Sequence, residues 1–274
     1  MTNILEDTST PSLVAAIETN LWAFILKSGT YTQAEIHDDP DMLWVMTGLP
    51  VGLHNGVLRG DVMPDNLDTT IKKVIERGRS RQAPILWSTG PATRPSDLGT
   101  HLERHGFIRD HDMVGMALDL AILKAPPAPP DLIIEQVKDI ETAQKWIEAS
   151  GAGFELPESL TQVVVERLAR AGVGPEAGTR NYIGWLNGNA VATSMLFLGE
   201  GIAGVYCVAT APAARRQGIG AAMTHFALQE AKVLGYRVGI LQASAMGYSV
   251  YRQLGFQEYC KIGQFHWSPE AVPV

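Results

Sequence analysis

Cysteine, long apolar runs and positive charge are all scarce in this chain. Its 274 residues include two cysteines, Cys207 and Cys260, too few for a framework of disulfides. No apolar stretch approaches the roughly 20 residues that a membrane-spanning helix needs. Aspartate and glutamate outnumber lysine and arginine by 29 to 22. The resulting net charge of −7 argues against a general nucleic-acid binder, which would need a basic face.

The first residues of the chain also lack the charged and then apolar pattern of a secretory signal. Together these absences predict a cytoplasmic protein with reduced thiols, with neither a membrane nor a nucleic acid as partner. The composition is globular, because 46% of the residues are hydrophobic and 19% are charged. A chain of this length buries about three quarters of its unfolded surface, in one large domain or two smaller ones.

The most informative segment is VATAPAARRQGIGA at residues 208–221. It predicts the end of a strand and then a glycine-bearing turn that opens into a helix, whose first turn has unpaired N–H groups and a partial positive charge. Gly218 and Gly220 lack side chains that would hold a phosphate away from those groups. Arg215 and Arg216 add formal charge beside them. The segment therefore predicts a pyrophosphate cradle, defined here as residues 216–221.

Two common phosphate-binding motifs do not fit this segment. A P-loop requires Lys-Ser or Lys-Thr after its glycines, and neither follows here. A dinucleotide fingerprint requires a small residue at the position of Met223. Its strand should also end at the first glycine, whereas residues 212–217 intervene.

A third motif does fit. Residues 215–220, RRQGIG, match Arg/Gln-x-x-Gly-x-Gly/Ala and resemble the coenzyme A pyrophosphate motif of the GNAT family of N-acetyltransferases; Pro212 also fits that pattern. A helix over residues 219–234, a stop at Gly235 and a strand over residues 237–243 are expected next. The ending Val-Tyr-x-x-Leu-Gly-Phe, at residues 250–256, resembles the second signature of the same family. Two signatures in this order leave little room for chance.

The clearest linker is the segment KAPPAPP at residues 124–130, whose prolines favour extended, semi-rigid backbone. We expect an N-terminal domain over residues 1–124, a linker over 125–131 and a catalytic domain over 132–274. The catalytic domain is predicted to have the mixed α/β sheet of the GNAT fold. Its expected strands cover residues 132–136, 180–186, 190–198, 202–210, 237–243 and 256–267. Its expected helices cover residues 139–149, 158–171 and 219–234 and a segment at Tyr248, with a hairpin turn at Asn187-Gly188.

The N-terminal half resembles the C-terminal half. PILWST at residues 84–89 resembles GILQAS at 239–244, and LGTHLERHGF at 98–107 resembles YSVYRQLGF at 248–256, with Leu102 in the place of Tyr251. Residues 66–78 are the expected preceding helix, but residues 60–65 lack the arginines and paired glycines. We interpret the chain as a tandem GNAT form whose first copy has lost the cradle and the phenol. The alternative is two unrelated α/β halves that share a Gly-Phe turn.

Acetyl transfer from a thioester to an amine requires a held coenzyme, a polarised carbonyl, a neutral amine and a proton for the thiolate. The resemblance implies that the pyrophosphate is bound by Arg215, Arg216, Gln217, Gly218, Ile219, Gly220 and Ala221. It implies that Val208, Ala209 and Thr210 pair with the pantetheine arm, on a strand that splays from its neighbour at a bulge. A backbone N–H of this strand is expected to polarise the thioester carbonyl.

Tyr251 is the expected general acid, because it matches a tyrosine with that role in the family and a phenol, with a pKa of about 10, is protonated at neutral pH. The alternative is a tyrosine that packs its ring and hydrogen-bonds its hydroxyl. Tyr248, one turn earlier, is a weaker candidate. Ser244 stands where relatives often carry an asparagine that binds the coenzyme arm, and a serine offers fewer hydrogen-bonding groups.

The general base is not evident in the sequence. Glu155, in the expected acceptor loop 153–157, is one candidate, and Gln242 is polar but cannot act as a base. For both, an ordinary surface or hydrogen-bonding role is favoured. Cys207 lies in an apolar strand, which favours a small buried hydrophobe over an acyl carrier.

No metal site is predicted. His101 and His105 are spaced i, i+4, but zinc needs three or four ligands and no third is indicated. His37, Asp38 and Asp39 predict a loop before Pro40. The scattered tryptophans are expected in the core, namely Trp22, Trp44 and Trp87.

The leading hypothesis is an N-acetyltransferase with acetyl-CoA as co-substrate. A primary amine, from a small molecule or a peptide N-terminus, would attack the thioester directly without an acyl-enzyme. The N-terminal half is expected to cap the acceptor cleft or to form the surface of a homodimer. The alternatives are a non-catalytic module that senses coenzyme A or holds a partner protein, and a nicotinamide-dependent enzyme.

Overall fold

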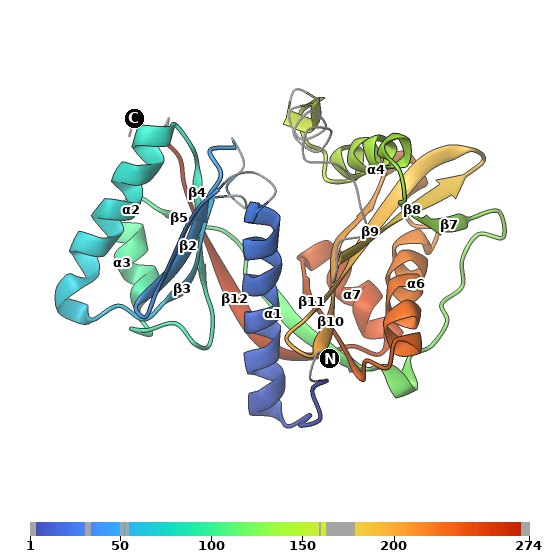
Figure 1. Ribbon diagram of the computed structural model, residues 1–274, viewed down its shortest axis with the longest axis horizontal. Helices are drawn as coiled ribbons and strands as arrows, with labels where there is room; N and C mark the ends of the chain where they lie inside the picture. Colours follow the sequence, from blue (N-terminus) through green and yellow to red (C-terminus); the bar gives the residue numbers. More distant parts are fainter. Residues whose placement is uncertain are drawn as a thin grey trace. The chain divides into compact units, whose positions relative to one another are not determined.

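The computed structural model describes residues 4–30, 34–49, 52, 55–158, 160–162 and 179–269. The chain divides into two compact units whose segments alternate along the sequence (Figure 1). Unit 1 comprises Met1–Asn20 and Met116–Tyr259, and unit 2 comprises Leu21–Gly115 and Cys260–Val274. No helix within the described ranges has both the length and the apolar character that crossing a membrane requires.

Unit 1 is built on a mixed sheet with the strand order β6-β11-β10-β9-β8-β7. Strands β10 and β11 are parallel, and the pairs β9–β10, β8–β9 and β7–β8 are antiparallel. Its elements, in chain order, are the end of β6 (Met113–Asp119), β7 (Ile133–Gln136), α4 (Ile140–Gly153), β8 (Thr179–Leu186), β9 (Asn189–Gly199), β10 (Ile202–Thr210), α6 (Ile219–Val233), β11 (Val238–Ala243), α7 (Ala245–Leu254) and the start of β12 (Gln257–Trp267).

Alternation of side chains along β8 places α4 and α6 on opposite faces of this sheet. Ile183 packs in the core of α4, with Trp146 and Ile147. The Tyr182 hydroxyl, on the other face, donates a hydrogen bond of 2.8 Å to Glu230 of α6. Asp139 begins α4 with a capping box, as its position in the sequence predicts.

Unit 2 repeats the mixed arrangement, with the strand order β1-β2-β3-β4-β12 and β5 paired with β12. Strands β3 and β4 are parallel, and β4 and β12 are antiparallel. Its elements are the second half of α1 (Thr10–Thr30), β1 (Glu35–Asp39), β2 (Met42–Met46), β3 (Asn55–Gly60), α2 (Leu67–Arg81), β4 (Ile85–Thr89), α3 (Leu98–Arg104), β5 (Ile108–Arg109), the start of β6 and the end of β12. The prediction of a mixed α/β fold is therefore confirmed.

The core of unit 2 lies on both faces of its sheet. On one face, residues of α2 and α3 surround the fully buried Trp87. On the other face, Leu43, Val45 and Leu58 pack with Ile25 of α1. Trp87 thus has the core position that the sequence predicts, while Trp22 and Trp44 are partly buried at its edges.

The two compact units do not coincide with the two halves of the sequence, because β6 and β12 each contribute residues to both units. The start of β12 lies in unit 1 and its end lies in unit 2, whereas β6 starts in unit 2 and ends in unit 1. The proline-rich segment 125–131 belongs to unit 1. The division into residues 1–124 and 132–274 stays a prediction about the two copies, because sequence patterns locate strands without specifying their partners.

Two N-terminal segments depart from what the sequence pattern indicates. Residues 10–30 form the helix α1, which is not among the elements expected from the sequence. The loop predicted at His37 to Asp39 is wrong, because these residues belong to β1, which pairs antiparallel with β2. The His37 ring stacks on Trp44 of β2, with centroids 5.3 Å apart, and its Nε2 lies 2.5 Å from Asp39 Oδ2. The helix expected at 158–171 falls largely outside the described residues; Glu158 and residues 160–162 are helical.

Candidate functional site

Strand β10 separates from β11 partway along its length. The two strands pair at Ala203–Gly239 and at Gly204–Ile240, and the described residues show no further pairing between them. On its other side β10 stays paired with β9, with one extra residue between Tyr206 and Ala209. Cys207, inside this bulge, has a φ of 50°. The bulge and splay expected from the resemblance are therefore present, and they turn one edge of residues 208–210 away from β11.

The cradle follows β10 directly. Arg216 and Gly218 both have left-handed backbone, with φ of 65° and 80°, and Gly218 is the N-cap of α6. The first hydrogen bond of the helix runs from the Ala222 N–H to the Gly218 carbonyl, at 3.0 Å. The N–H groups of Ile219, Gly220 and Ala221 precede that bond and carry the positive end of the helix dipole. This geometry suits an anion such as a diphosphate.

The surroundings of the two cradle glycines, Gly218 and Gly220, explain the absence of a side chain in different ways. A Cβ at Gly218 would lie 2.6 Å from the Pro127 carbonyl oxygen, in the proline-rich segment, and would have to accept a positive φ. A Cβ at Gly220 would meet only Thr210 Oγ1, at 3.7 Å. The fold therefore requires Gly218, whereas Gly220 leaves open space in front of the first turn of α6.

The two arginines of the motif also differ. Arg216 is exposed and forms no ion pair with any residue that the structure describes. Arg215 is held by three partners: its Nε donates to the Thr210 carbonyl at 3.1 Å, its Nη2 donates to the Gly153 carbonyl at 2.8 Å, and its Nη1 lies 2.7 Å from Glu155 Oε1. The Arg216 side chain is thus available to bind a phosphate. Arg215 instead links the end of α4 to the end of β10 through hydrogen bonds.

Gly153 allows the end of α4 to lie close to the end of β10. A Cβ there would lie 2.7 Å from the Ala209 Cβ and 2.9 Å from the Thr210 backbone nitrogen. Any larger residue would push the end of α4 away from the bulged strand. Glu155, the candidate base, has one carboxylate oxygen engaged by Arg215, so binding an acceptor proton would compete with the ion pair. Sequence spacing does not reveal this junction, because Gly153 and Arg215 are far apart in the chain.

Tyr251 lies on α7, half buried, with its ring edge-on to Phe256 at a centroid distance of 6.0 Å. Burial raises the pKa of its phenol to about 12, and a hydrogen bond with Thr224 of α6 acts in the opposite direction. Thr224 is fully buried and donates to the Gly220 carbonyl at 2.9 Å. A single polar side chain thus connects the phenol to the helix turn of the cradle. Its signal in the sequence is one threonine on the apolar face of α6.

The other predicted polar residues have structural partners. Ser244 is the N-cap of α7, and its hydroxyl accepts a hydrogen bond from the Gly247 N–H at 3.3 Å. The Tyr248 hydroxyl donates to Glu258 at 3.3 Å, and Gln242 donates to the Ile17 carbonyl at 3.4 Å. The capping role accounts for Ser244 without a coenzyme, so its contact with the pantetheine arm stays a prediction.

Burial raises the pKa of the Cys207 thiol to about 12. The thiolate is the nucleophilic form of cysteine, so this thiol is poorly suited to carry an acyl group.

The corresponding strand end in unit 2 is covered by the chain itself. The loop 90–97 lies against the end of β3, where the Arg94 N–H donates to the Gly60 carbonyl at 2.8 Å and the Val62 N–H donates to the Arg94 carbonyl at 3.0 Å. Asp61 and Arg94 form a parallel bridge. These bonds use backbone groups that a coenzyme arm would need.

His101 and His105 in unit 2 lie beside carboxylates. His101 is within 3.9 Å of Asp68 and 3.6 Å of Asp97, and His105 is 3.6 Å from Asp68. In the part of the chain that the structure describes, no three histidine, cysteine or acidic side chains are grouped so as to hold a metal ion.

Comparison with known proteins agrees with this geometry. The protein-family model of the acetyltransferase (GNAT) domain matches residues 178–258, which include β10, the cradle and α7. No significant match was found among curated proteins.

Several solved structures share the fold over most of the chain. A GCN5-related N-acetyltransferase from Kribbella flavida is 17% identical, with a TM-score of 0.69, and the match covers 92% of this chain and 95% of that one. One from Sphaerobacter thermophilus is 17% identical, with a TM-score of 0.57 and coverage of 84% and 81%. A tandem GNAT protein from the clavulanic acid biosynthesis pathway is 13% identical, with a TM-score of 0.53 and coverage of 85% and 79%. Residues 178–258 therefore match the GNAT domain, and the chain has the fold of GCN5-related N-acetyltransferases.

Proposed function

We propose that unit 1 is an N-acetyltransferase that moves an acetyl group from acetyl-CoA to a primary amine. One observation carries the proposal: the open edge of β10 at residues 208–210 leads directly into the cradle, so an extended chain ending in a diphosphate fits both. The diphosphate would bind the N–H groups of the first turn of α6, with Arg216 adding charge from the side. The amides of the pantetheine arm would pair with Val208, Ala209 and Thr210.

Direct attack by the amine fits the chemistry of the bulge better than an acyl-enzyme. The only thiol of the site among the described residues is that of Cys207, and it is protonated at neutral pH because burial raises its pKa to about 12. A neutral amine would therefore attack the thioester carbon, and the C–S bond would break to release the coenzyme as a thiolate. A backbone N–H of β10 would polarise the carbonyl oxygen as charge develops on it.

Tyr251 would give a proton to the leaving sulfur, while the attacking nitrogen would lose its extra proton to water. The Tyr251 phenolate would then regain a proton from solvent. A phenol with a pKa of about 12 does not readily give its proton to a thiolate in water, because the pKa of a free thiol is about 8.5. Elsewhere in unit 1, however, burial raises the pKa of a thiol, that of Cys207, to about 12 as well. A coenzyme thiolate desolvated to the same degree would match the phenol in basicity, and the proton transfer would then be nearly balanced.

The acceptor would approach beside the junction of α4 and β10. Arg215 holds the Gly153 carbonyl and the Glu155 carboxylate at this place, so it positions the loop after α4 relative to the strand that binds the donor. We propose a primary amine of a small molecule or a peptide N-terminus as the acceptor class.

The test is release of free thiol from acetyl-CoA in the presence of a panel of amines, with acetylated products identified by mass spectrometry. Turnover that Tyr251→Phe slows at neutral pH supports the proposal. Tight binding of acetyl-CoA without thiol release for any acceptor would instead identify a non-catalytic coenzyme sensor. A larger shift of the melting temperature with NAD than with acetyl-CoA would contradict both, because a ligand stabilises the state that binds it.

A further inference from the structure

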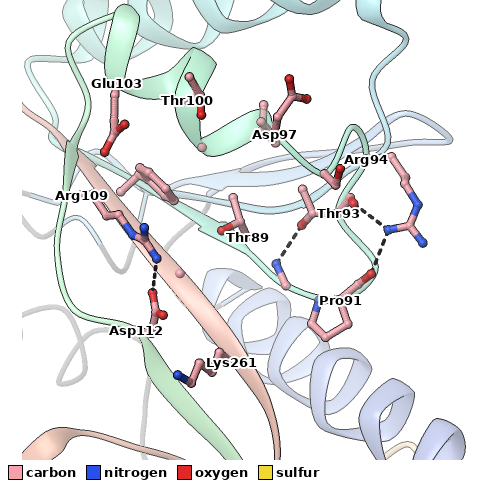
Figure 2. A pocket seen from close by; sticks show the side chains of 16 residues that line it. Thr89, Pro91, Thr93, Arg94, Asp97, Thr100, Glu103, Arg109, Asp112 and Lys261 are labelled. Carbon is pink, nitrogen blue, oxygen red and sulfur yellow. Dashed lines mark hydrogen bonds and ion pairs between the residues drawn. The ribbon is translucent and has the colours of Figure 1, made fainter.

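Unit 2 contains a cavity of about 510 Å³ that has no role in the proposed transfer reaction (Figure 2). It is open to solvent and is lined by the loop 90–97, by α3 and by residues of β12 and of the segment 109–112, all of which belong to unit 2. Its volume lies within the range of small-molecule sites, roughly 300–1,000 Å³.

The cavity has a closely packed floor. The Phe265 ring lies under α3, where a Cβ at Gly99 would be 2.6 Å from it. A Cβ at Gly263 would be 2.6 Å from Thr89 Oγ1. The two glycines thus allow α3, β4 and β12 to meet without a gap, and the floor is fixed by the packing of the unit.

Six charged side chains line the walls, three of each sign. Arg94, Arg109 and Lys261 are the cations, and Asp97, Glu103 and Asp112 are the anions.

This charge balance decides which ligands the cavity favours. A phosphate ester or a coenzyme tail would bring several negative charges against three carboxylates, and a polyamine would meet three cations. A ligand without net charge is therefore preferred.

Some of these charges are already paired and others are not. Arg109 lies 3.0 Å from Asp112 and 5.9 Å from the centre of the Phe265 ring, so its guanidinium is held in place. Arg94 donates to the carbonyls of Pro91 and Thr93. Lys261 and Glu103 form no ion pair with any residue in the described ranges.

The two unpaired charges, Glu103 and Lys261, lie on different elements that line the cavity. Glu103 lies on α3 and Asp97 directly precedes this helix. Arg109 and Lys261 lie on the other side, together with Asp112, which Arg109 already pairs, as Figure 2 shows. One wall therefore suits a ligand cation and the other a ligand anion.

We propose that this cavity binds a small zwitterion with one ammonium group and one carboxylate, the chemistry of a free α-amino acid or a short peptide. The ligand carboxylate would bind Lys261 and the unused N–H groups of Arg109. The ammonium group would lie against Glu103 and Asp97, and hydroxyls such as Thr100 would satisfy remaining polar groups.

The cavity is a property of unit 2 and does not depend on the proposed function. In unit 1, α7 begins at Ala245, two residues after β11 ends, so no equivalent of the loop 90–97 exists there. In unit 2 the same loop covers the end of β3 and forms one wall of the cavity. The loop 90–97 thus covers the end of β3 and also lines the cavity.

The test uses the full chain and a panel of the standard amino acids with the dipeptides Gly-Gly and Ala-Ala, screened by thermal shift and measured by calorimetry. The proposal expects at least one member to bind, with free amino acids and dipeptides as separate arms. For the best binder, the amide that lacks the carboxylate and the analogue that lacks the amine should each bind about tenfold more weakly. Glu103→Gln and Lys261→Gln should each weaken binding of the parent compound to a similar degree.

Arg104→Gln is the matched control, because Arg104 is an exposed charge on α3 outside the cavity lining. It should leave the affinity unchanged. Both lining residues are exposed, so melting temperatures without ligand should match the wild type and exclude misfolding. The proposal is overturned if no panel member binds, or if the lining variants bind as well as the wild type does. Acetyl-CoA binding, measured in parallel, separates this outcome from a failure of the proposed function.

Discussion

Unit 1 and unit 2 each contain a bulged strand, a helix, a parallel strand and a second helix that ends before a Gly-Phe pair. In unit 1 these are β10, α6, β11 and α7, and in unit 2 they are β3, α2, β4 and α3. Both first strands pair antiparallel with the preceding strand and carry one extra residue in that pairing. We propose that they descend from one duplicated sequence, as their motifs predict.

The difference between the units lies in what meets the end of the bulged strand. In unit 1 the strand enters the cradle, and α6 starts from Gly218 with free N–H groups. In unit 2, Gly60 and Val62 bond to the loop 90–97. The same scaffold therefore has an open strand edge in one unit and a strand end covered by the loop 90–97 in the other.

The largest expected effect sharpens the contrast between Tyr251 and Leu102, its counterpart in unit 2. Tyr251→Phe should lower kcat about a hundredfold at neutral pH, because the leaving thiolate loses its proton donor. KM for acetyl-CoA should change little. Tyr248→Phe is the control, since its hydroxyl contacts Glu258 and not the cradle. An unchanged kcat in Tyr251→Phe, which keeps the aromatic ring, would show that Tyr251 acts by packing alone.

The two cradle glycines should separate folding from binding. Gly220→Ala should weaken acetyl-CoA binding about tenfold while leaving stability unchanged, because its Cβ would occupy the open space where a phosphate would lie. Gly218→Ala should instead lower the free energy of unfolding by about 1–2 kcal/mol or more, because of its positive φ and the Pro127 carbonyl. Calorimetry and urea titration measure the two quantities. Normal coenzyme affinity in Gly220→Ala would place the diphosphate elsewhere.

Charge reversal should distinguish arginines in the two units. Arg216→Glu should weaken acetyl-CoA binding several-fold, up to about tenfold, with a smaller effect at high salt. Arg237→Glu, which changes an exposed arginine in the same unit, should have little effect. Arg59→Glu in unit 2 should reduce stability without changing affinity, because Arg59 bonds to Asp38 and to the Asp39 carbonyl. A loss of affinity in Arg59→Glu equal to that in Arg216→Glu would break the comparison.

The smallest expected effect concerns the pH dependence of kcat, which we expect to be absent in the alkaline range. The phenol of Tyr251 donates only when protonated, and its pKa of about 12 keeps it so through the alkaline range. With a peptide N-terminus as acceptor, whose pKa is about 8, kcat should stay flat from about pH 8.5 to pH 10. An unshifted tyrosine would be half ionised at about pH 10, so a twofold fall there would contradict a buried general acid.

Much of unit 1 could be predicted from local signals. Asp139 caps α4, Asn187 and Gly188 form the hairpin turn with φ of 50° and 76°, and Gly218 starts α6. Each signal acts within a few residues, so the sequence alone contains it. The cradle motif and the Tyr251 motif are of this kind.

What escaped prediction depends on contacts between distant residues. The exchange of β6 and β12 between units and the junction of Arg215 with Gly153 both arise from tertiary packing. Arg215 shows this most clearly, since its motif indicates a phosphate ligand while its contacts are to the protein. The loop at 90–97 likewise gains its role only by meeting β3.

The most direct measurement is a crystal structure of the protein with acetyl-CoA. The account predicts one coenzyme per chain, with its diphosphate on the N–H groups of Ile219, Gly220 and Ala221 and its pantetheine arm along residues 208–210. It predicts no coenzyme at the end of β3. A diphosphate bound in unit 2, or anywhere away from the first turn of α6, would contradict the account.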